Sequence, residues 1–391
     1  MKSSLLSLLA LTLLGGTSAA CSSSDTGSGS EPGTAGGGGS GNTGGAGGVD
    51  PTPTDNPCGL HTTFPGDDLC IPPPAENVGF QMHVGPDSYD DPDVIGAVGA
   101  DGRPVWTMAP GDERTQCFHL KTPNTRDIYY YEQQYRMRPG SHHLIVSVSA
   151  NANAAPGWGT CDGGITGAIG GTQHSVEDYP AGGVAPEDAN LARAVAPATP
   201  LDFQLHFFNA GEEPTLREVW VNFLYKEWVE GVTQNLGMLG GFAQVSVAPH
   251  TSVQTGSTCK YENALRPSGM TEARVLSLFG HAHAHNTRFA VWKDSAGGTS
   301  EVVYDNYDWA ESPQFFYNTR VQNPVPDETT RKSGASSGLL TLGPGDQLRF
   351  QCDITNDLNT ALRGSNEVYT GEMCNLFGSF VGPGFPCFAL Q

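Results

Sequence analysis

The chain has little positive charge. Its 391 residues contain 20 Lys and Arg against 41 Asp and Glu, which gives a formal net charge of −21 at pH 7. An acidic surface repels both phosphate backbones and anionic lipid headgroups. The composition therefore argues against nucleic acid as a partner and against a membrane contact made by basic side chains.

The sequence also lacks several motifs of common enzymes and metal sites. It has no G-x-x-x-x-G-K phosphate loop, no H-E-x-x-H zinc-protease motif and no C-x-x-C thiolate pair. Residues 334–338, GASSG, match the G-x-S-x-G pattern of serine hydrolases. A polar loop precedes them and a strand pattern follows, so the strand-turn-helix context of a nucleophile is missing and we expect a loop.

Long apolar runs are absent except at the N-terminus. Residues 1–20 have one Lys, an apolar stretch and then small residues, which is the pattern of a signal peptide. Cys21 follows and is a candidate for lipidation. Residues 21–54 are rich in Gly and Ser and predict a flexible linker. We expect an exported protein, either secreted or a cell-envelope lipoprotein, whose only membrane contact is a lipid at Cys21.

The rest of the chain is dominated by strand patterns. Short runs rich in Val, Phe, Tyr and Leu alternate with Gly, Pro or Asn, for example RDIYYYEQQYRM and DQLRFQCDI. Residues 186–195, PEDANLARAV, are the one stretch that favours a helix. At this length the pattern predicts an all-β fold of two tandem antiparallel β-sandwiches, jelly-roll-like, over residues 55–230 and 231–391.

Cysteine is present in an arrangement that suits export. There are nine cysteines: 21, 58, 70, 117, 161, 259, 352, 374 and 387. If Cys21 carries a lipid, eight remain, an even number compatible with four disulfides. Metal thiolates are the alternative, but the missing C-x-x-C pair favours disulfides.

Three histidines alternate in the stretch FGHAHAHNTRFAVW, residues 279–292. Positions i and i+2 of a strand face the same side, so His281 and His283 could bind one metal ion. His285 continues the alternation. A solvated polar strand face is the other interpretation of so short a motif.

Other potential ligands occur in three further stretches. GSHHLIVSV contains His142 and His143, LDFQLHFFN contains His206, and EMCNLFGSF contains Met373. Adjacent strand residues normally face opposite sides, so His142 and His143 can share a metal only where the strand bulges or ends. A lone His in an apolar strand is usually a hydrogen-bonded core residue, and a Met before an apolar run usually packs. Singly, none of these stretches defines a metal site.

In this order, however, the motifs HH, QLHF, HxH and EMCNL form a set. Over roughly residues 110–390 the chain resembles the copper type II, ascorbate-dependent monooxygenases, the family of peptidylglycine α-hydroxylating monooxygenase and dopamine β-monooxygenase. An all-β architecture in two domains is also that family's. The resemblance implies two coppers per chain, one on His142, His143 and His206, the other on His281, His283 and Met373.

The resemblance also implies the reaction. It is hydroxylation of an activated C–H bond of a small-molecule substrate, with O₂ and with ascorbate or another one-electron reductant. Three imidazoles suit both oxidation states of copper, whereas the thioether of Met373 favours Cu(I) at the catalytic site that it would share with His281 and His283. Zinc is the other metal that three histidines would suit, but it has little use for a thioether.

The same family template implies disulfide pairs and a substrate contact. The pairs are Cys117 with Cys161, Cys352 with Cys374, and Cys259 with Cys387, which leaves Cys58 for Cys70. Asn375 keeps the family's residue and is a candidate substrate contact. The peptide-amidating member has an Arg where this chain has Phe279 and a Tyr where it has Phe377, which argues against a carboxylate-bearing peptide as substrate. His285 could be an alternative ligand, a hydrogen-bond partner or a surface residue, and we expect one of the latter two roles.

Two other functions fit parts of the pattern. A non-catalytic copper-binding surface lipoprotein would use the same ligands without turnover. A metal-free adhesive pair of sandwiches would leave the histidines without a purpose. The presence of all six ligand residues favours the enzyme.

Overall fold

The computed structural model describes residues 56–161, 167–179, 186–226, 234–260 and 272–382. Their regular structure is nearly all β, and the sheets are almost wholly antiparallel, so the predicted all-β sandwich fold is confirmed. The predicted signal peptide, Cys21 and the linker lie outside these residues. Within the described ranges, no helix has the length and apolar character needed to cross a membrane.

One ten-stranded sheet takes strands from both halves of the chain. Neighbouring strands within this sheet are antiparallel, except that β9 and β13 run parallel over two residue pairs. In spatial order the strands are β1 (Gly79–Val84), β12 (Val219–Lys226), β4 (Ile128–Met137), β9 (Leu191–Val195), β13 (Gln234–Phe242), β24 (Cys374–Val381), β16 (Ala273–Ala282) and β19 (Phe315–Phe316). Two more strands add to it, β8 (Val176–Tyr179) on β4 and β21 (Leu340–Leu342) on β16.

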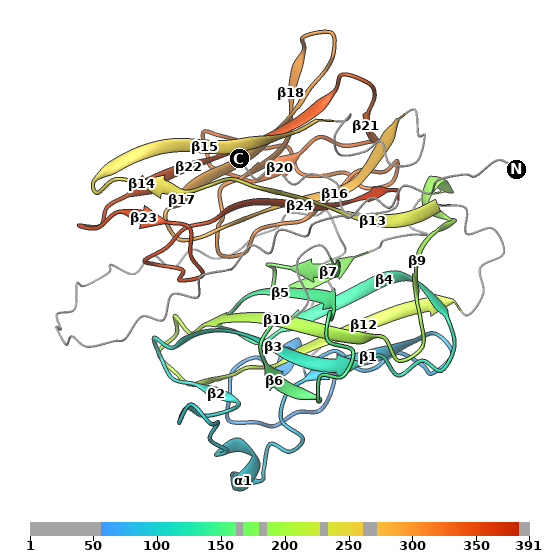
Figure 1. Ribbon diagram of the computed structural model, residues 1–391, viewed down its shortest axis with the longest axis vertical. Helices are drawn as coiled ribbons and strands as arrows, with labels where there is room; N and C mark the ends of the chain where they lie inside the picture. The colour runs from blue at the N-terminus through green and yellow to red at the C-terminus, as the bar shows by residue number, and fades with distance from the viewer. Residues whose placement is uncertain (1–55, 162–166, 180–185, 227–233, 261–271, 383–391) are drawn as a thin grey trace, which may run out of the picture. The chain divides into compact units, whose positions relative to one another are not determined.

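Two five-stranded sheets complete the layers, one in each half (Figure 1). The first is β6 (Gly157–Gly159), β3 (Glu113–Lys121), β10 (Pro200–Phe208), β5 (Ser141–Val148) and β7 (Ala168–Thr172). The second is β15 (Thr251–Lys260), β22 (Gln347–Asn356), β17 (Asn286–Asp294), β18 (Ser300–Asn306) and β20 (Gly334–Ala335). Smaller elements are the pairs β2 (Thr107–Met108) with β11 (Thr215–Leu216) and β14 (Ser246–Val247) with β23 (Leu362–Arg363), the helix α1 (Pro92–Ile95), and the 3₁₀ turns Asp67–Leu69 and Pro186–Asp188.

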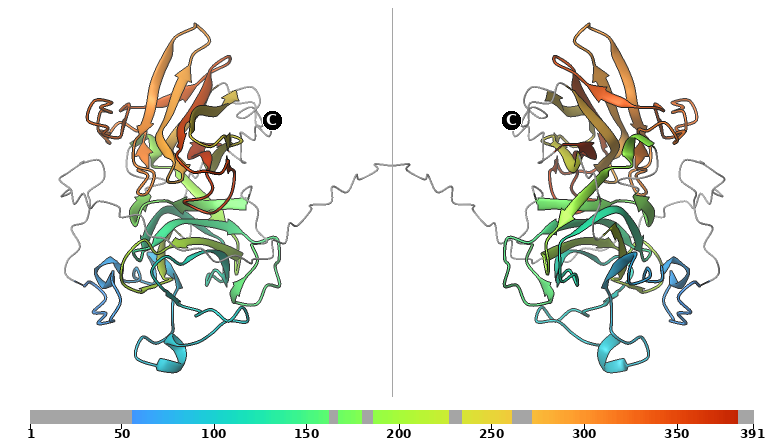
Figure 2. Two further views of the ribbon diagram at one scale, coloured as in Figure 1. Left: turned by 90° about the vertical axis from the view of Figure 1, so that its left-hand side faces the viewer. Right: turned by 90° about the vertical axis from the view of Figure 1, so that its right-hand side faces the viewer.

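Strand periodicity builds two hydrophobic cores. In β22 every second residue from Leu348 onward is buried, because alternate side chains of a strand face the same layer. The first core comes mainly from residues 82–223, and the second core comes from strands of residues 239–380. Both layer pairs are seen from two further sides in Figure 2. Three residues of the second half, Leu276, Phe316 and Val381, join the first core, so the domain boundary at residue 230 stays a prediction.

The prediction of a helix over residues 186–195 was wrong. A 3₁₀ turn occupies its start, and Leu191–Val195 forms β9 between β4 and β13. An isolated helix of about ten residues is marginally stable in water. Here Leu191 and Val195 are buried in the first core, and the backbone of β9 pairs with its neighbours on both sides, so tertiary packing overrides the local preference.

Disulfides join cysteines in both halves of the chain. The bonds between described residues are Cys58–Cys70, Cys117–Cys161 and Cys352–Cys374, the same pairs as predicted. Cys259 is also disulfide-bonded, and its predicted partner, Cys387, lies outside the described residues. Such bonds persist in oxidising compartments, so they indicate an extracellular or equivalent environment.

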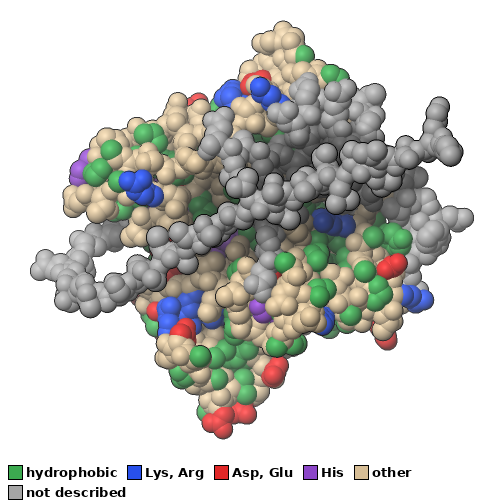
Figure 3. Space-filling model, viewed as in Figure 1, with side chains coloured by type: hydrophobic (Ala, Val, Ile, Leu, Met, Phe, Trp, Pro, Cys, Tyr) green, Lys and Arg blue, Asp and Glu red, His purple; other side chains and the backbone are tan. Residues whose placement is uncertain are grey.

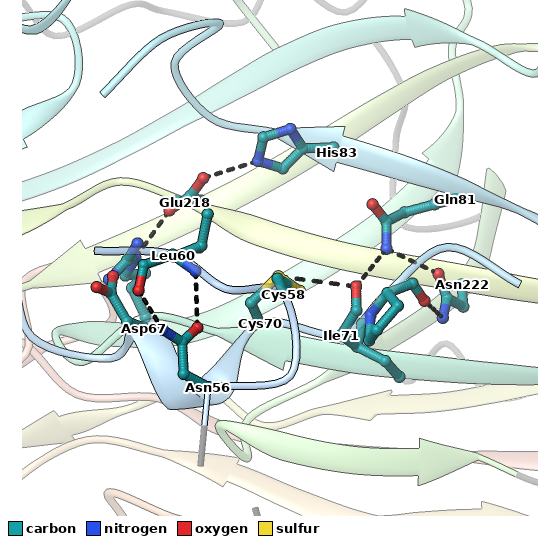
Figure 4. The surroundings of a disulfide bond; sticks show 12 residues. Asn56, Cys58, Leu60, Asp67, Cys70, Ile71, Gln81, His83, Glu218 and Asn222 are labelled. Atoms are coloured by element: carbon teal, nitrogen blue, oxygen red, sulfur yellow. Dashed lines mark hydrogen bonds and ion pairs between the residues drawn. A yellow bond between two sulfur atoms is a disulfide. The ribbon is translucent and has the colours of Figure 1, made fainter. Parts of the chain in front are cut away.

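The Cys58–Cys70 disulfide lies in a segment that an ion-pair network attaches to the ends of β4 and β12 (Figure 4). Arg138 is fully buried; its Nη1 lies 2.7 Å from Asp67 Oδ1 and its Nε 2.7 Å from Glu218 Oε2. A buried guanidinium is tolerated where carboxylates satisfy it, so this network fixes the segment before β1 against β12.

Exposed charge is distributed unevenly over the surface. Asp90, Asp91 and Asp93 are all exposed beside or within α1, and Asp91 caps that helix by accepting a hydrogen bond from Asp93 N. In Figure 3 acidic side chains gather at the corresponding tip, whereas basic ones are scattered elsewhere on that face. The acidic excess of the sequence is therefore visible on the folded surface.

The second core supplies a test of the packing. Phe350 is 1% exposed and stacks on Phe289 with ring centroids 5.9 Å apart. We expect Phe350→Ala to lower the free energy of unfolding by about 3–5 kcal/mol, because it removes the ring and leaves a cavity. Chemical denaturation measures the change. Leu339→Ala, at a side chain that is 51% exposed, is the control and should change it by about 0.5 kcal/mol or less; equal effects of the two substitutions would contradict the described core.

Candidate metal centre

β5 and β10 carry the first three histidines. His206 of β10 pairs directly with His143 of β5 across the antiparallel ladder. Beside this pair the register shifts: Phe207 pairs with Ser141, so His142 is an extra residue on β5. Such a β-bulge breaks the regular alternation of side chains. It meets the condition under which adjacent histidines can face one site.

His281 lies near the end of β16, where this strand pairs with β24, and His283 directly follows the strand. The pairing places His281 opposite Asn375. Met373 lies two residues before Asn375, and Asn375 Nδ2 donates a hydrogen bond of 3.5 Å to the Met373 sulfur. The thioether therefore lies next to the residue that faces His281 across the ladder.

All five predicted histidine ligands lie in one buried cluster. None is more than 6% exposed. The ring centroids are 4.7 Å apart for His143 and His281, 5.1 Å for His142 and His206, 5.1 Å for His142 and His283, and 5.3 Å for His281 and His283. Residues that sequence analysis assigned to two separate sites are thus neighbours.

The structure groups the ring nitrogens differently from the predicted ligand sets. Among the described residues, two groups of three histidines have possible ligand atoms within 4.8 Å of one another, and they share His142. One group is His142, His206 and His283, and the other is His142, His143 and His281. Each combines imidazoles from both halves of the chain.

The chemistry of these rings fits a metal ion. His142 Nε2, His143 Nδ1, His206 Nδ1 and both ring nitrogens of His283 are buried without a hydrogen-bond partner among the described residues. Each buried polar atom left unpaired costs about 1–3 kcal/mol. A metal ion that accepts the lone pairs of several rings at once would remove much of this cost.

Burial also keeps the rings in the metal-binding form. It lowers the pKa of His142, His143 and His281 well below the usual value, and the neighbouring imidazoles lower these values further. The same causes lower the pKa of His283 to about 3. These rings are neutral at pH 7, and neutral imidazole is the form that ligates metals.

Two side chains orient the rings from outside the cluster. His206 Nε2 lies 2.8 Å from Glu113 Oε1, which also accepts a 2.8 Å hydrogen bond from Val368 N. His281 Nδ1 lies 2.7 Å from Gln173 Oε1. These contacts leave Nδ1 of His206 and Nε2 of His281 for a metal, and such partners fix ring orientation and tautomer.

Glu372 links the backbones of two predicted ligands. Its side chain is fully buried, and Oε1 accepts hydrogen bonds from His283 N at 2.6 Å and Met373 N at 2.8 Å. Oε2 accepts a 3.0 Å hydrogen bond from His285 N. Burial raises the pKa of Glu372 to about 7, although the backbone N–H donors oppose the shift. The carboxyl group thus holds the end of β16 against the start of β24.

The remaining predicted residues lie around the cluster. His285 Nε2 is 2.8 Å from the Tyr369 carbonyl oxygen, in agreement with a hydrogen-bonding role. Phe279 and Phe377 have ring centroids 5.3 Å apart, and the Phe377 ring lies 6.3 Å from that of His281. Two buried aromatic rings therefore lie beside His281.

Sequence analysis missed Glu113, Gln173 and Glu372. Glu113 and Gln173 are 93 and 108 residues from the histidines that they contact, so no local pattern marks them. Glu372 belongs to the EMCNL motif, and its position beside Met373 was the available signal.

A scan against protein-family models and a search of curated proteins both find no match. The functional assignment therefore depends on the donor atoms, the burial and the geometry of this chain. Those features describe a buried, neutral, histidine-rich site, with a thioether beside Asn375, that can hold a transition metal.

The role of Glu372 can be tested by Glu372→Gln, which replaces one acceptor oxygen by an NH₂ group facing backbone N–H donors. We expect metal affinity to fall about 10–100-fold, as for other groups that orient ligands. We also expect the free energy of unfolding to fall by about 1–3 kcal/mol. Metal titration calorimetry and chemical denaturation measure the two effects. Glu367→Gln, at an exposed position nearby, is the matched control; unchanged metal affinity in Glu372→Gln would refute the linking role.

Proposed function

We propose that the protein is a copper-dependent monooxygenase, which hydroxylates an activated C–H bond of a small organic substrate with O₂ and a one-electron reductant such as ascorbate. The observation that carries the proposal is the buried cluster of five histidines, four of which have a ring nitrogen without a hydrogen-bond partner among the described residues. The ordered motifs HH, QLHF, HxH and EMCNL, which resemble the copper monooxygenases, supply the choice of metal and reaction.

The donor set favours copper over zinc. The residues that would hold it are His142, His143 and His206 for one ion, and His281, His283 and Met373 for the other. Imidazoles suit both oxidation states of copper, and a thioether stabilises Cu(I). Bound copper would supply one-electron redox chemistry and the activation of O₂.

The protein's own groups would prepare the site for that chemistry. Glu113 and Gln173 hold two rings by hydrogen bonds, and Glu372 fixes the backbone of His283 and Met373. Burial keeps the imidazoles neutral and removes bulk water, which protects reactive intermediates from side reactions. The apolar rings of Phe279 and Phe377 beside His281 favour an uncharged substrate over a carboxylate.

The alternative function uses the same ligands without turnover. A copper-binding surface lipoprotein would take up the metal but would not consume O₂ in the presence of ascorbate. Export is part of both proposals, and the disulfides support it because they form in oxidising compartments. Reductant-dependent oxygen uptake across a panel of small amines, alcohols and amides separates the two functions.

We predict two coppers per chain in the copper-reconstituted protein, measured by elemental analysis after removal of excess metal. The two groups of neighbouring ring nitrogens share His142, and the five imidazoles together with the Met373 thioether supply six donors, three for each ion. A reproducible ratio near one, or zinc retained against copper, would contradict the two-site assignment.

Met373→Ile should remove the soft ligand while keeping the volume of the side chain similar. We expect the reduced, copper-loaded variant to lose copper–sulfur scattering in X-ray absorption and to lose reductant-driven oxygen uptake. Met82→Ile, in the first core, is the matched control and should retain both. If Met373→Ile keeps the sulfur signal and the oxygen uptake, Met373 is a packing residue.

His143→Ala should fail in a different way, since it removes an imidazole and leaves the thioether. We expect the copper–sulfur signal to persist while turnover is lost. His250→Ala, at an exposed histidine outside the cluster, should behave as wild type. Loss of the sulfur signal in His143→Ala would show that the two ligand sets are not separable.

A further inference from the structure

A loop of the second half of the chain brings an indole ring onto the histidine cluster. Residues 307–314 connect β18 to β19, and the Trp309 ring centroid lies 6.0 Å from that of His142. His142 belongs to both groups of neighbouring imidazoles. Aromatic rings in contact have centroids roughly 4.5–7 Å apart, so Trp309 packs directly against the centre of the cluster.

A phenol ring continues from Trp309 to the protein surface. The ring centroids of Trp309 and Tyr369 are 6.0 Å apart, and Tyr369 is 44% exposed, whereas none of the five clustered histidines is more than 6% exposed. Tyr369 also contacts the phenyl ring of Phe208, with centroids 4.8 Å apart. The rings of His142, Trp309 and Tyr369 therefore form a continuous series of contacts from the buried cluster to water.

Hydrogen bonds hold the loop that carries Trp309. Gln173 Nε2 donates to the Trp309 carbonyl oxygen, and Gln173 Oε1 lies 2.7 Å from His281 Nδ1, so one side chain joins the loop to the cluster. The Glu311 carboxylate accepts hydrogen bonds from Ser175 N at 3.0 Å and from Ser175 Oγ at 2.7 Å. These contacts fix the position of the indole ring relative to the imidazoles.

The third histidine of the alternating motif supports the outer ring. His285 Nε2 donates a 2.8 Å hydrogen bond to the Tyr369 carbonyl oxygen, and His285 N donates to Glu372 Oε2 at 3.0 Å. Neither proposed ligand set uses His285. Its contacts instead tie the segment that contains Tyr369 to the segment that follows β16, so His285 is a positioning residue for the phenol.

We propose that Trp309 and Tyr369 form a relay that carries one-electron oxidising equivalents from the metal centre to the protein surface. Indole and phenol rings are oxidised by one electron far more readily than phenyl rings. Trp309 gives one electron to the centre and becomes a radical cation. Tyr369 then reduces that radical cation, and its phenolic proton passes to water because the side chain is exposed. A soluble one-electron reductant returns an electron to the tyrosyl radical, which takes up a proton from water.

The relay protects the imidazole ligands from oxidation when no organic substrate consumes the oxidising equivalent. That this equivalent arises from bound copper with O₂ or peroxide rests on the proposed function, whereas the series of ring contacts does not. Two experiments separate these parts, one without metal and one with it.

The first experiment uses the metal-free, full-length protein and azide radicals generated by pulse radiolysis. An azide radical takes one electron from a Trp side chain and becomes azide ion. In the wild type we expect a first-order phase in which indolyl absorbance decays while phenoxyl absorbance rises. Tyr369→Phe and Trp309→Phe should each reduce the amplitude of this phase, and Tyr307→Phe, in the same loop, should retain it. Equal amplitudes in all four proteins would overturn the proposal.

The second experiment treats the copper-loaded protein with hydrogen peroxide in the absence of organic substrate. Freeze-quench EPR should detect a tyrosyl radical in the wild type and in Tyr307→Phe, and this radical should be lost in Tyr369→Phe and in Trp309→Phe. Peptide mass spectrometry should show more oxidation of His142 in both relay variants. Because the two rings act in series, the double variant should behave as Trp309→Phe alone.

Unchanged radical yield and unchanged His142 oxidation in both relay variants would overturn the protective role. Oxygen uptake with a reductant tests the proposed function separately. If the wild type forms the relay-dependent radical with peroxide but consumes no O₂, the monooxygenase assignment fails and the relay stands.

Discussion

The burial of histidine rings without hydrogen-bond partners is the constraint that organises the centre of this protein. Hydrophobic cores normally exclude polar atoms or satisfy them internally. Here ring nitrogens of His142, His143, His206 and His283 are buried and unpaired, and burial holds the pKa of several of these rings far below the usual value. Such an arrangement is costly unless a ligand compensates it, and a metal ion is the ligand that neutral imidazoles attract.

The register of the paired strands brings these histidines together. The bulge on β5 makes His142 an extra residue beside the His143–His206 pair, and the β16–β24 ladder places His281 opposite Asn375. Hydrogen bonds from Glu113 and Gln173 then fix the rings of His206 and His281, and Glu372 holds the backbone of His283.

The surroundings of the cluster define what chemistry it could serve. The Phe279 and Phe377 rings beside His281 carry neither charge nor hydrogen-bonding groups. An environment of this kind favours small, uncharged molecules over charged ones. The Cys352–Cys374 disulfide reinforces it, because Cys374 directly follows Met373 and begins β24.

The sequence by itself determined the all-β class and most strands, because strand periodicity is a local property of the chain. The candidate ligands and the cysteine pairs were implied by the family resemblance of the ordered motifs, and three of those pairs are disulfides in the structure. Tertiary structure decided the rest. Residues Leu191–Val195 became a strand because packing between β4 and β13 outweighed a weak helical preference. The joining of histidines from both halves into one cluster, and the recruitment of Glu113 and Gln173 across about a hundred residues, depend on sheet pairing and side-chain contacts that have no local signature.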